Sequence, residues 1–73
     1  MTVKVGQIYK DTVLKSKIVI TWIAMDKTQY FMVREDGFFL HSNNFDKDED
    51  VVLIAEYPTW QEAVNSPEFK GVK

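Results

Sequence analysis

Apolar residues in the first 57 positions occur in short blocks or alternate with polar residues, a pattern typical of β-strands. The opening VKVGQIY predicts a short strand with a turn or a bulge at Gly6. The β-branched segment 15–25 predicts a second strand. Its alternation places Ile18, Ile20, Trp22 and Ala24 on one face and Val19, Thr21 and Ile23 on the other. Because strands that are apolar on both faces are usually central or sharply bent, we expect this one to be so.

Two further strand-like segments, YFMVRE and FFLH, flank the dipeptide Asp36-Gly37. Asp-Gly in this setting predicts a hairpin with a two-residue type I′ turn, in which both turn residues take positive φ. The following HSNNFDKDED is rich in turn formers and acids and predicts a loop with Phe45 as its apolar residue. VVLIAEY, residues 51–57, then returns to the strand pattern.

The segment EYPTWQEAVNSPEF, residues 56–69, predicts the end of the last strand and a helix. Thr59 and Glu62 match a capping box, and Ser66-Pro67 matches a second cap with proline at the first helical position. The helix presents one apolar stripe, formed by Trp60, Ala63 and Val64. A helix this short is not stable without packing, so we expect the segment to close the protein's own core.

Four or five short strands and one short C-terminal helix predict a mainly β (β+α) fold, with residues 1–73 forming a single domain. We expect a small SH3-like barrel or a strongly bent antiparallel sheet, with strands at about residues 3–57 and the helix at about residues 60–66. The 10 aromatic residues suit so small a core, because each ring supplies a large buried area. The chain has no cysteine, which excludes disulfides and thiolate metal sites.

Candidate catalytic residues are sparse, and we expect neither an enzyme nor a cofactor. His41 is the only histidine, which excludes a multi-histidine metal site. It could act as a general base with Asp46 or Asp48, although a lone histidine at a strand end is more often a half-exposed polar residue. Ser42 and Ser66 lack the glycine-flanked elbow of serine hydrolases, and the three glycines form no phosphate-binding loop.

The acidic run DKDED is a candidate calcium loop. If Asp46 is taken as the first position, Asp48 and Asp50 fit the alternate acidic positions of the EF-hand template. Val51 occupies the sixth position, where the template needs glycine, and Tyr57 the twelfth, where it needs glutamate. The sequence therefore favours a solvated acidic loop that holds no metal.

The net charge of −2 conceals opposite balances in the two halves of the chain. Residues 1–34 carry six basic and two acidic side chains (+4), and residues 35–73 carry three basic and nine acidic ones (−6). We expect the acidic half to steer a protein partner toward Phe45, Asp46, Asp48, Glu49 and Asp50. One alternative is a nucleic-acid-binding barrel that uses Lys4, Lys10, Lys15 and Lys17 with Tyr9 and Trp22. Another is an acidic DNA mimic that occupies a host nucleic-acid-binding protein.

The sequence predicts a soluble intracellular protein. MTVKVGQIYK has charges among its apolar residues and lacks the apolar core of an export signal. The longest apolar stretch, Ile18–Met25, is too short to cross a bilayer, so we expect no membrane partner. A homo-oligomer could form through an unpaired edge strand.

The stretch GFFLHSNNF is similar to the end of eukaryotic signalling SH3 domains, where a glycine, an aromatic residue and a Ser-Asn pair precede the last strand. The acidic-aromatic opening and the paired tryptophans of that family have no counterpart in this chain. The resemblance therefore implies at most a shared barrel topology, without the binding of proline-rich peptides.

The opening VKVGQIY and the ending LIAEYPTWQEAVNSPEF resemble short, mostly uncharacterised proteins encoded by phages and prophages of Gram-positive bacteria. The resemblance covers about a third of the chain and brings no catalytic or binding residues with it. It implies a cytoplasmic accessory protein in an infected or lysogenic host. The sequence as a whole predicts a non-enzymatic interaction module that modulates an unidentified host or phage protein.

Overall fold

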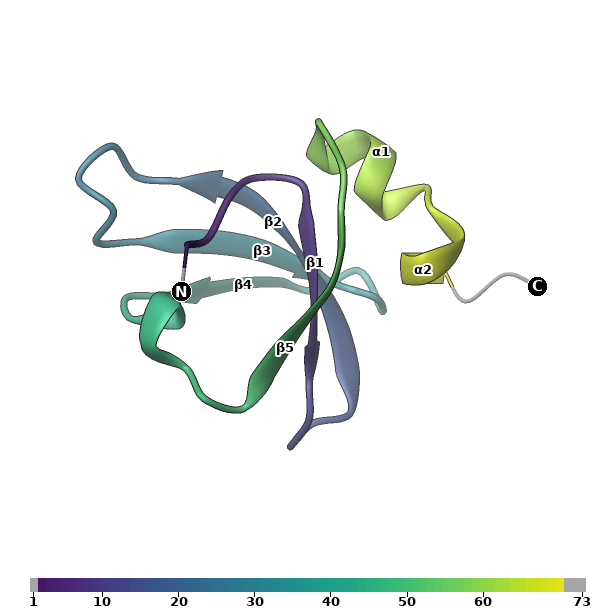
Figure 1. Ribbon diagram of the computed structural model, residues 1–73, viewed down its shortest axis with the longest axis horizontal. Helices are drawn as coiled ribbons and strands as arrows, with labels where there is room; N and C mark the ends of the chain where they lie inside the picture. Colours follow the sequence, from purple (N-terminus) through teal and green to yellow (C-terminus); the bar gives the residue numbers. More distant parts are fainter. Residues whose placement is uncertain (1, 71–73) are drawn as a thin grey trace.

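The computed structural model describes residues 2–70, which form five strands, one 3-10 turn and two short α-helices (Figure 1). The strands are β1 (Gln7–Asp11), β2 (Ser16–Ile23), β3 (Tyr30–Arg34), β4 (Phe39–Ser42) and β5 (Val51–Glu56). The 3-10 turn η1 (Phe45–Lys47) precedes β5, and α1 (Trp60–Val64) and α2 (Pro67–Lys70) follow it. The predicted mainly β fold with a helical C-terminal part is confirmed. Two helices stand where one was predicted.

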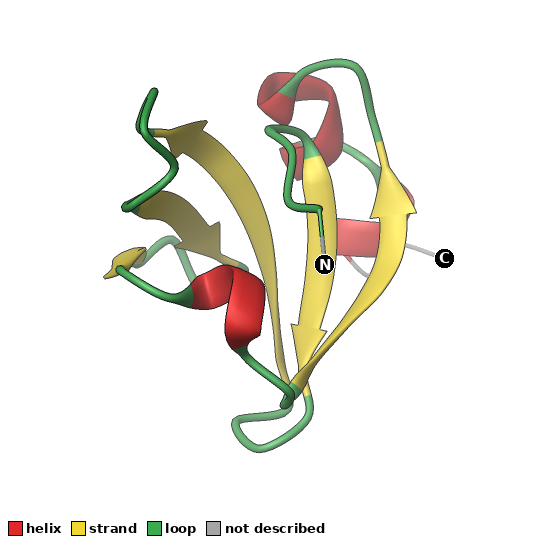
Figure 2. Cartoon of the chain, turned by 60° about the vertical axis from the view of Figure 1, so that its left-hand side comes forward, coloured by secondary structure: helices red, strands yellow, loops and turns green. Residues whose placement is uncertain are grey.

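The strands form one antiparallel sheet in the order β4-β3-β2-β1-β5. This order puts β2 at the centre and β4 and β5 at opposite edges. The sheet bends strongly, so that β1 and β5 stand at an angle to β3 and β4 (Figure 2). Of the two predicted architectures, the strongly bent sheet is the one observed.

Strand β2 contributes apolar side chains to both faces of the sheet, as its sequence predicts for a central strand. One face carries η1 and is called the η1 face; the other carries α1 and α2 and is called the helix face. Ile20 belongs to the η1-face core and Val19 to the helix-face core. The register with β3 then shifts between Ile20 and Trp22, which marks a bulge at Thr21. After this bulge Ile23 packs on the η1 face, so the prediction that Trp22 points the same way as Ile20 is wrong.

The η1-face core is built on aromatic residues of three segments and aliphatic residues of the central strands. It contains Tyr9, Ile18, Ile20, Tyr30, Met32 and Phe45. The Phe45 ring, 3% exposed, meets the Tyr9 ring edge to face with centroids 5.0 Å apart. The only apolar residue of the acidic loop is thus what fastens that loop to the sheet.

The helix-face core contains Ile8, Val19, Val33, Ala63 and Phe69, the last two contributed by the helices. The Thr59 hydroxyl oxygen accepts from the Glu62 N–H at 3.2 Å, and the Ser66 hydroxyl oxygen accepts from the Phe69 N–H at 3.3 Å. Thr59 and Ser66 therefore both cap as predicted, the second cap starting α2 at Pro67. The Glu62 carboxylate accepts from the Thr59 hydroxyl at 3.2 Å, where the predicted capping box has it accept from the Thr59 N–H. The C-terminal segment closes the protein's own core, as expected from its short apolar stripe.

The β3–β4 hairpin turns at Asp36 and Gly37, as predicted, but with a different loop. Gly37 has φ +93°, whereas Asp36 is not among the residues with positive φ, so the type I′ prediction is wrong. The Gly37 N–H donates to the Arg34 carbonyl at 2.9 Å, and the Arg34 N–H donates to the Phe38 carbonyl at 2.7 Å. These bonds define a type I turn followed by a left-handed glycine, which is the common three-residue hairpin loop.

Gly6 precedes β1, which starts at Gln7 rather than near residue 3 as the sequence predicted. Gly6 has φ +94°, and its N–H donates to the Ile20 carbonyl at 2.9 Å. Its carbonyl accepts from the Tyr57 N–H at 3.1 Å. The glycine therefore joins the central strand to the end of β5, a place where the backbones approach too closely for a side chain.

Candidate functional site

Four ring side chains lie on the helix face of three neighbouring strands and are called the aromatic strip: Trp22, Phe31, Phe39 and His41. Phe31 pairs with Trp22 on one side and with His41 on the other. The Phe31 ring centroid lies 5.2 Å from that of Trp22 and 4.8 Å from that of His41. Three neighbouring strands thus align their rings across the sheet, and Phe39 extends the strip along β4.

The strip is open to solvent. Trp22 is 52% exposed and Phe39 72% exposed, while His41 is exposed and Phe31 half-buried. The helices α1 and α2 cover the neighbouring part of the same face, where Val19 and Val33 are buried. A small chain that buries rings on both faces of its sheet yet leaves these together on the surface has the pattern of an interaction site.

Local backbone geometry puts these rings on the helix face. The bulge at Thr21 reverses the alternation of β2, so that Trp22 joins Val19 on the helix face. The three-residue hairpin loop sets Val33 opposite Phe39, which fixes the β4 rings on the same side. Without either feature, part of the strip would face the η1 side of the sheet.

A groove of about 200 Å³ lies on the η1 face beside β4. Its floor is apolar and is formed by Ile18, Met32, Leu40 and Phe45. The two carboxylates of its rim already have partners within the chain. The Asp11 carboxylate accepts from the Leu14 N–H at 3.0 Å, and the Asp48 carboxylate accepts from the Asp50 N–H at 2.8 Å. A groove whose floor is apolar and whose carboxylates are already hydrogen-bonded suits an apolar side chain better than a cation.

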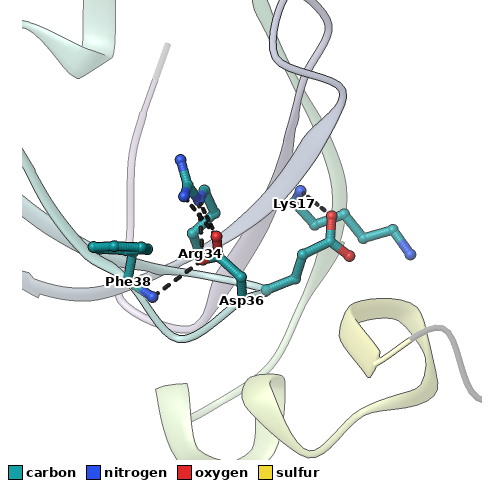
Figure 3. Close-up of polar contacts among 5 residues, drawn as sticks. Lys17, Arg34, Asp36 and Phe38 are labelled. Carbon is teal, nitrogen blue, oxygen red and sulfur yellow. Dashed lines mark hydrogen bonds and ion pairs between the residues drawn. The ribbon is translucent and has the colours of Figure 1, made fainter.

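Arg34 on the groove rim is held by the hairpin (Figure 3). Its Nε lies 3.0 Å from both carboxylate oxygens of Asp36, and its guanidinium carbon lies 5.0 Å from the Phe38 ring centroid. The hydrogen bonds from Arg34 hold the pKa of the Asp36 carboxyl below its usual range. The same hydrogen bonds with Asp36 raise the pKa of the Arg34 guanidinium. The guanidinium is thus occupied at the turn, where the Phe38 N–H also donates to Asp36 at 3.2 Å.

His41 is placed for ring stacking. Its imidazole packs on Phe31 on the helix face, whereas the acids predicted as its helpers, Asp46 and Asp48, belong to the loop on the η1 face. An open hollow of about 450 Å³ lies beside it and is lined by His41, Ser42, Asn43 and Asn44. Ser42, Asn43 and Asn44 offer uncharged donors and acceptors next to His41.

The predicted acidic surface lies in one loop but does not include its aromatic residue. Phe45 is a core residue, so its ring is not at the surface that a partner would meet. Glu49 and Asp50 are exposed, whereas Asp46 and Asp48 are half-buried. Within residues 2–70, no three His, Cys, Asp or Glu side chains are grouped so that they could hold a metal ion.

The lysines of the nucleic-acid hypothesis do not surround an exposed ring. Lys10 on β1 lies directly opposite Lys17 on β2, and Lys15 occupies the intervening turn with φ +56°. Tyr9 is 1% exposed, and its hydroxyl donates to Gln7 Oε1 at 2.7 Å. Trp22 lies five residues further along β2 than Lys17, about 16 Å at the usual rise of a strand. Lys4 precedes β1 and is exposed.

Comparisons of the chain with protein-family models, with curated proteins and with solved structures found no match. Within the described residues, no helix is both long and apolar enough to span a membrane.

Two residues of the strip, Phe31 and Phe39, were not identified from the sequence as candidate binding residues. The sequence feature that could have identified them is the aromatic content of QYFMV and FFLH, on either side of the turn at Asp36-Gly37. Which rings share a face depends on the pairing register, and the predicted two-residue loop gives the wrong one.

Proposed function

We propose that the protein is a small, non-enzymatic interaction module whose docking surface for a protein partner is the aromatic strip. The observation that supports it is the exposed alignment of Trp22, Phe31 and His41 across three strands, extended by Phe39. Aromatic rings that lose their remaining water contacts at an interface contribute strongly to protein binding. The strip is preformed, because two of its rings are already held against Phe31, so little ordering opposes association.

A protein partner fits the strip better than a nucleic acid. Single-strand binding needs rings beside basic side chains, and here the lysine pair Lys10 and Lys17 lies at the other end of β2 from Trp22. The strip itself carries no formal charge with His41 neutral. The acids of the η1 loop form a second surface on the other side of the sheet, where they can steer an approaching basic partner. A DNA mimic would use those acids and leave the strip without a role.

The resemblance to phage and prophage proteins supports a bacterial setting for this proposal. It covers parts of β1 and β5, which form one side of the sheet, and most of the two helices that form the lid. We place the partner among host or phage proteins of the cytoplasm of a Gram-positive bacterium. The strip, which lies outside those segments, is then where this chain would select its own partner.

The proposal is tested by affinity purification of the tagged full chain from an extract of a Gram-positive bacterium, with quantitative mass spectrometry. The test variant is Phe39→Ser, which removes a 72% exposed ring, and the matched control is Leu53→Ser, a 47% exposed apolar residue at the opposite sheet edge. We expect recovery of the partner to fall about tenfold or more with Phe39→Ser, as for a hot-spot residue, and to stay unchanged with Leu53→Ser.

Equal recovery by Phe39→Ser and the wild-type chain would contradict the proposal. So would a partner that is lost when the extract is treated with nuclease, because the strip would then act on a nucleic acid. Recovery that depends on the lysines or on the acidic loop, and not on Phe39, would point to one of the two alternative functions.

A further inference from the structure

The edge of β4 carries backbone groups that face away from the sheet. Within residues 2–70, β4 has a strand neighbour on one side only, where it pairs with β3. The hydrogen bond from the Arg34 N–H to the Phe38 carbonyl fixes which β4 residues bond to β3, because inward and outward groups alternate along an antiparallel strand. By this alternation, Leu40 and Ser42 bond inward. The N–H and C=O groups of Phe39 and His41 point outward.

The two edges of the sheet differ in how well they resist pairing with another chain. The β5 edge has a bulge between Leu53 and Ala55 and ends in Glu56, and bulges and charges are common protections of edge strands. The β4 segment FLHS pairs with β3 without a register shift and contains no charged residue and no proline. Of the common protections against pairing with another chain, β4 therefore has only its short length. It is the edge of the sheet that is more open to an added strand.

Both faces beside the β4 edge can receive apolar side chains. On the helix face lie Phe39 and His41 of the aromatic strip. On the η1 face lies the apolar groove, which Leu40 and Ser42 border. A strand added to β4 would run about 4.8 Å away and would direct successive side chains to opposite faces, alternately toward the strip and toward the groove.

We propose that β4 binds an extended, uncharged segment of another protein as a sixth strand, with one apolar side chain in the groove and its neighbours along the strip. This inference rests on the proposed docking function and names the form of the partner. The backbone bonds at Phe39 and His41 would supply affinity, and the groove would select the side chain. A second copy of this chain fits less well. Its own β4 would offer the groove only Leu40, which packs in its own core, and the polar Ser42.

The test uses the full-length ¹⁵N-labelled chain and three synthetic probes. The probes are acetylated, amidated nine-residue peptides in which threonine alternates with leucine, valine or phenylalanine. We expect at least one of them to shift the amide NMR signals of Phe39 and His41, with smaller changes in β5. The same peptide, N-methylated at every second amide so that one edge cannot donate, should lose binding about tenfold or more, since it loses its backbone bonds.

Proline substitution tests the same edge from the side of the protein. His41→Pro removes an outward N–H while keeping the bonds to β3, so the sheet should tolerate it as edge strands tolerate proline. The matched controls are His41→Ala, which removes the ring and keeps the N–H, and Leu53→Pro on the other edge. We expect peptide binding to fall about tenfold or more with His41→Pro, and by less than about twofold with Leu53→Pro. Binding should fall less with His41→Ala than with His41→Pro.

The inference is overturned if none of the three peptides shifts the β4 signals, or if N-methylation leaves the affinity unchanged. It is also overturned if the chain itself dimerises through β4, seen as a halving of mass in His41→Pro by light scattering. A bacterial partner that depends on Phe39 but is insensitive to His41→Pro would contradict strand addition and leave the docking function intact. Should His41→Pro fail to fold, the N-methylated peptide decides the outcome with the unaltered protein.

Discussion

Phe31 on β3 lies directly opposite His41 on β4, and their ring centroids are 4.8 Å apart on a face of the sheet that solvent reaches. Trp22 on β2 completes the alignment from the other side of Phe31. The residues on either side of Phe31 in β3, Tyr30 and Met32, are buried in the η1-face core. On one face β3 thus contributes Tyr30 and Met32 to the core, and on the other face its Phe31 joins the aromatic strip while Val33 is buried under the helices.

The two glycines with positive φ should respond differently to alanine. At Gly37 (φ +93°) an added Cβ would have nothing within 4 Å, so Gly37→Ala carries only backbone strain. That strain costs about 1–2 kcal/mol. At Gly6 (φ +94°) the same atom would lie 2.2 Å from the Tyr57 carbonyl oxygen. We expect Gly6→Ala to cost more than about 4 kcal/mol, since β1 and β5 must also separate. Urea denaturation measures both losses, and equal losses would contradict the close approach.

Phe69, rather than Trp60, should be the principal anchor of the helical lid. Phe69 is 6% exposed in the helix-face core, whereas Trp60 packs at its margin and is half-buried. Phe69→Ala should therefore reduce the free energy of unfolding by about 3–5 kcal/mol, as for other buried phenylalanines. Trp60→Ala should reduce it by less. A larger loss for Trp60→Ala in urea denaturation would show that the lid packs differently.

The contact between the Tyr57 hydroxyl and the Glu68 carboxylate should stabilise the lid over a limited pH range. This hydrogen bond raises the pKa of Tyr57 and lowers the pKa of Glu68. Because the pKa of Glu68 is lowered, its contribution to the free energy of unfolding is present at pH values above the ordinary Glu pKa of about 4.3. This contribution is lost as the pH falls through the folded-state pKa. Because the pKa of Tyr57 is raised, its contribution to the free energy of unfolding is present at pH values below the ordinary Tyr pKa of about 10. This contribution is lost as the pH rises through the folded-state pKa.

Tyr57→Phe isolates this contact, because other titrating groups cancel when the variant is compared with the wild-type chain. The difference in Tm between the two proteins should be largest near neutral pH and should shrink both toward about pH 3 and toward about pH 11. Thermal unfolding followed by circular dichroism at a series of pH values measures it. A difference that is constant from acid to alkaline pH would mean that the contact does not stabilise the lid.

The scaffold could be predicted from the sequence because its signals are local. The two caps depend on Thr59 and Ser66 acting within one helical turn, and both act as predicted. The central position of β2 follows from a strand that is apolar on both faces. The need of short helices for packing predicts the lid without any knowledge of the sheet.

The aromatic strip could not be predicted, because it depends on pairing register. A two-residue loop at Asp36-Gly37 would pair Glu35 with Phe38, whereas the observed loop pairs Arg34 with Phe38. This change of one residue moves every β4 side chain to the other face, and it brings His41 opposite Phe31. The bulge at Thr21 likewise moves the Trp22 side chain to the other face of the sheet. No glycine marks the position of this bulge in the sequence. The alternation of polar and apolar residues along a strand does not by itself reveal a shift of the pairing register.

The most direct test of the docking surface is the fluorescence of Trp22 in a Trp60→Phe chain, where it is the only tryptophan, on titration with the partner captured from the bacterial extract. Trp22 is 52% exposed in the free chain, so its emission should be that of an indole in water. We predict a shift of the emission to shorter wavelength and protection from acrylamide quenching as the partner binds, because the strip loses its water. An unchanged emission and quenching of Trp22 at saturating partner would contradict the account.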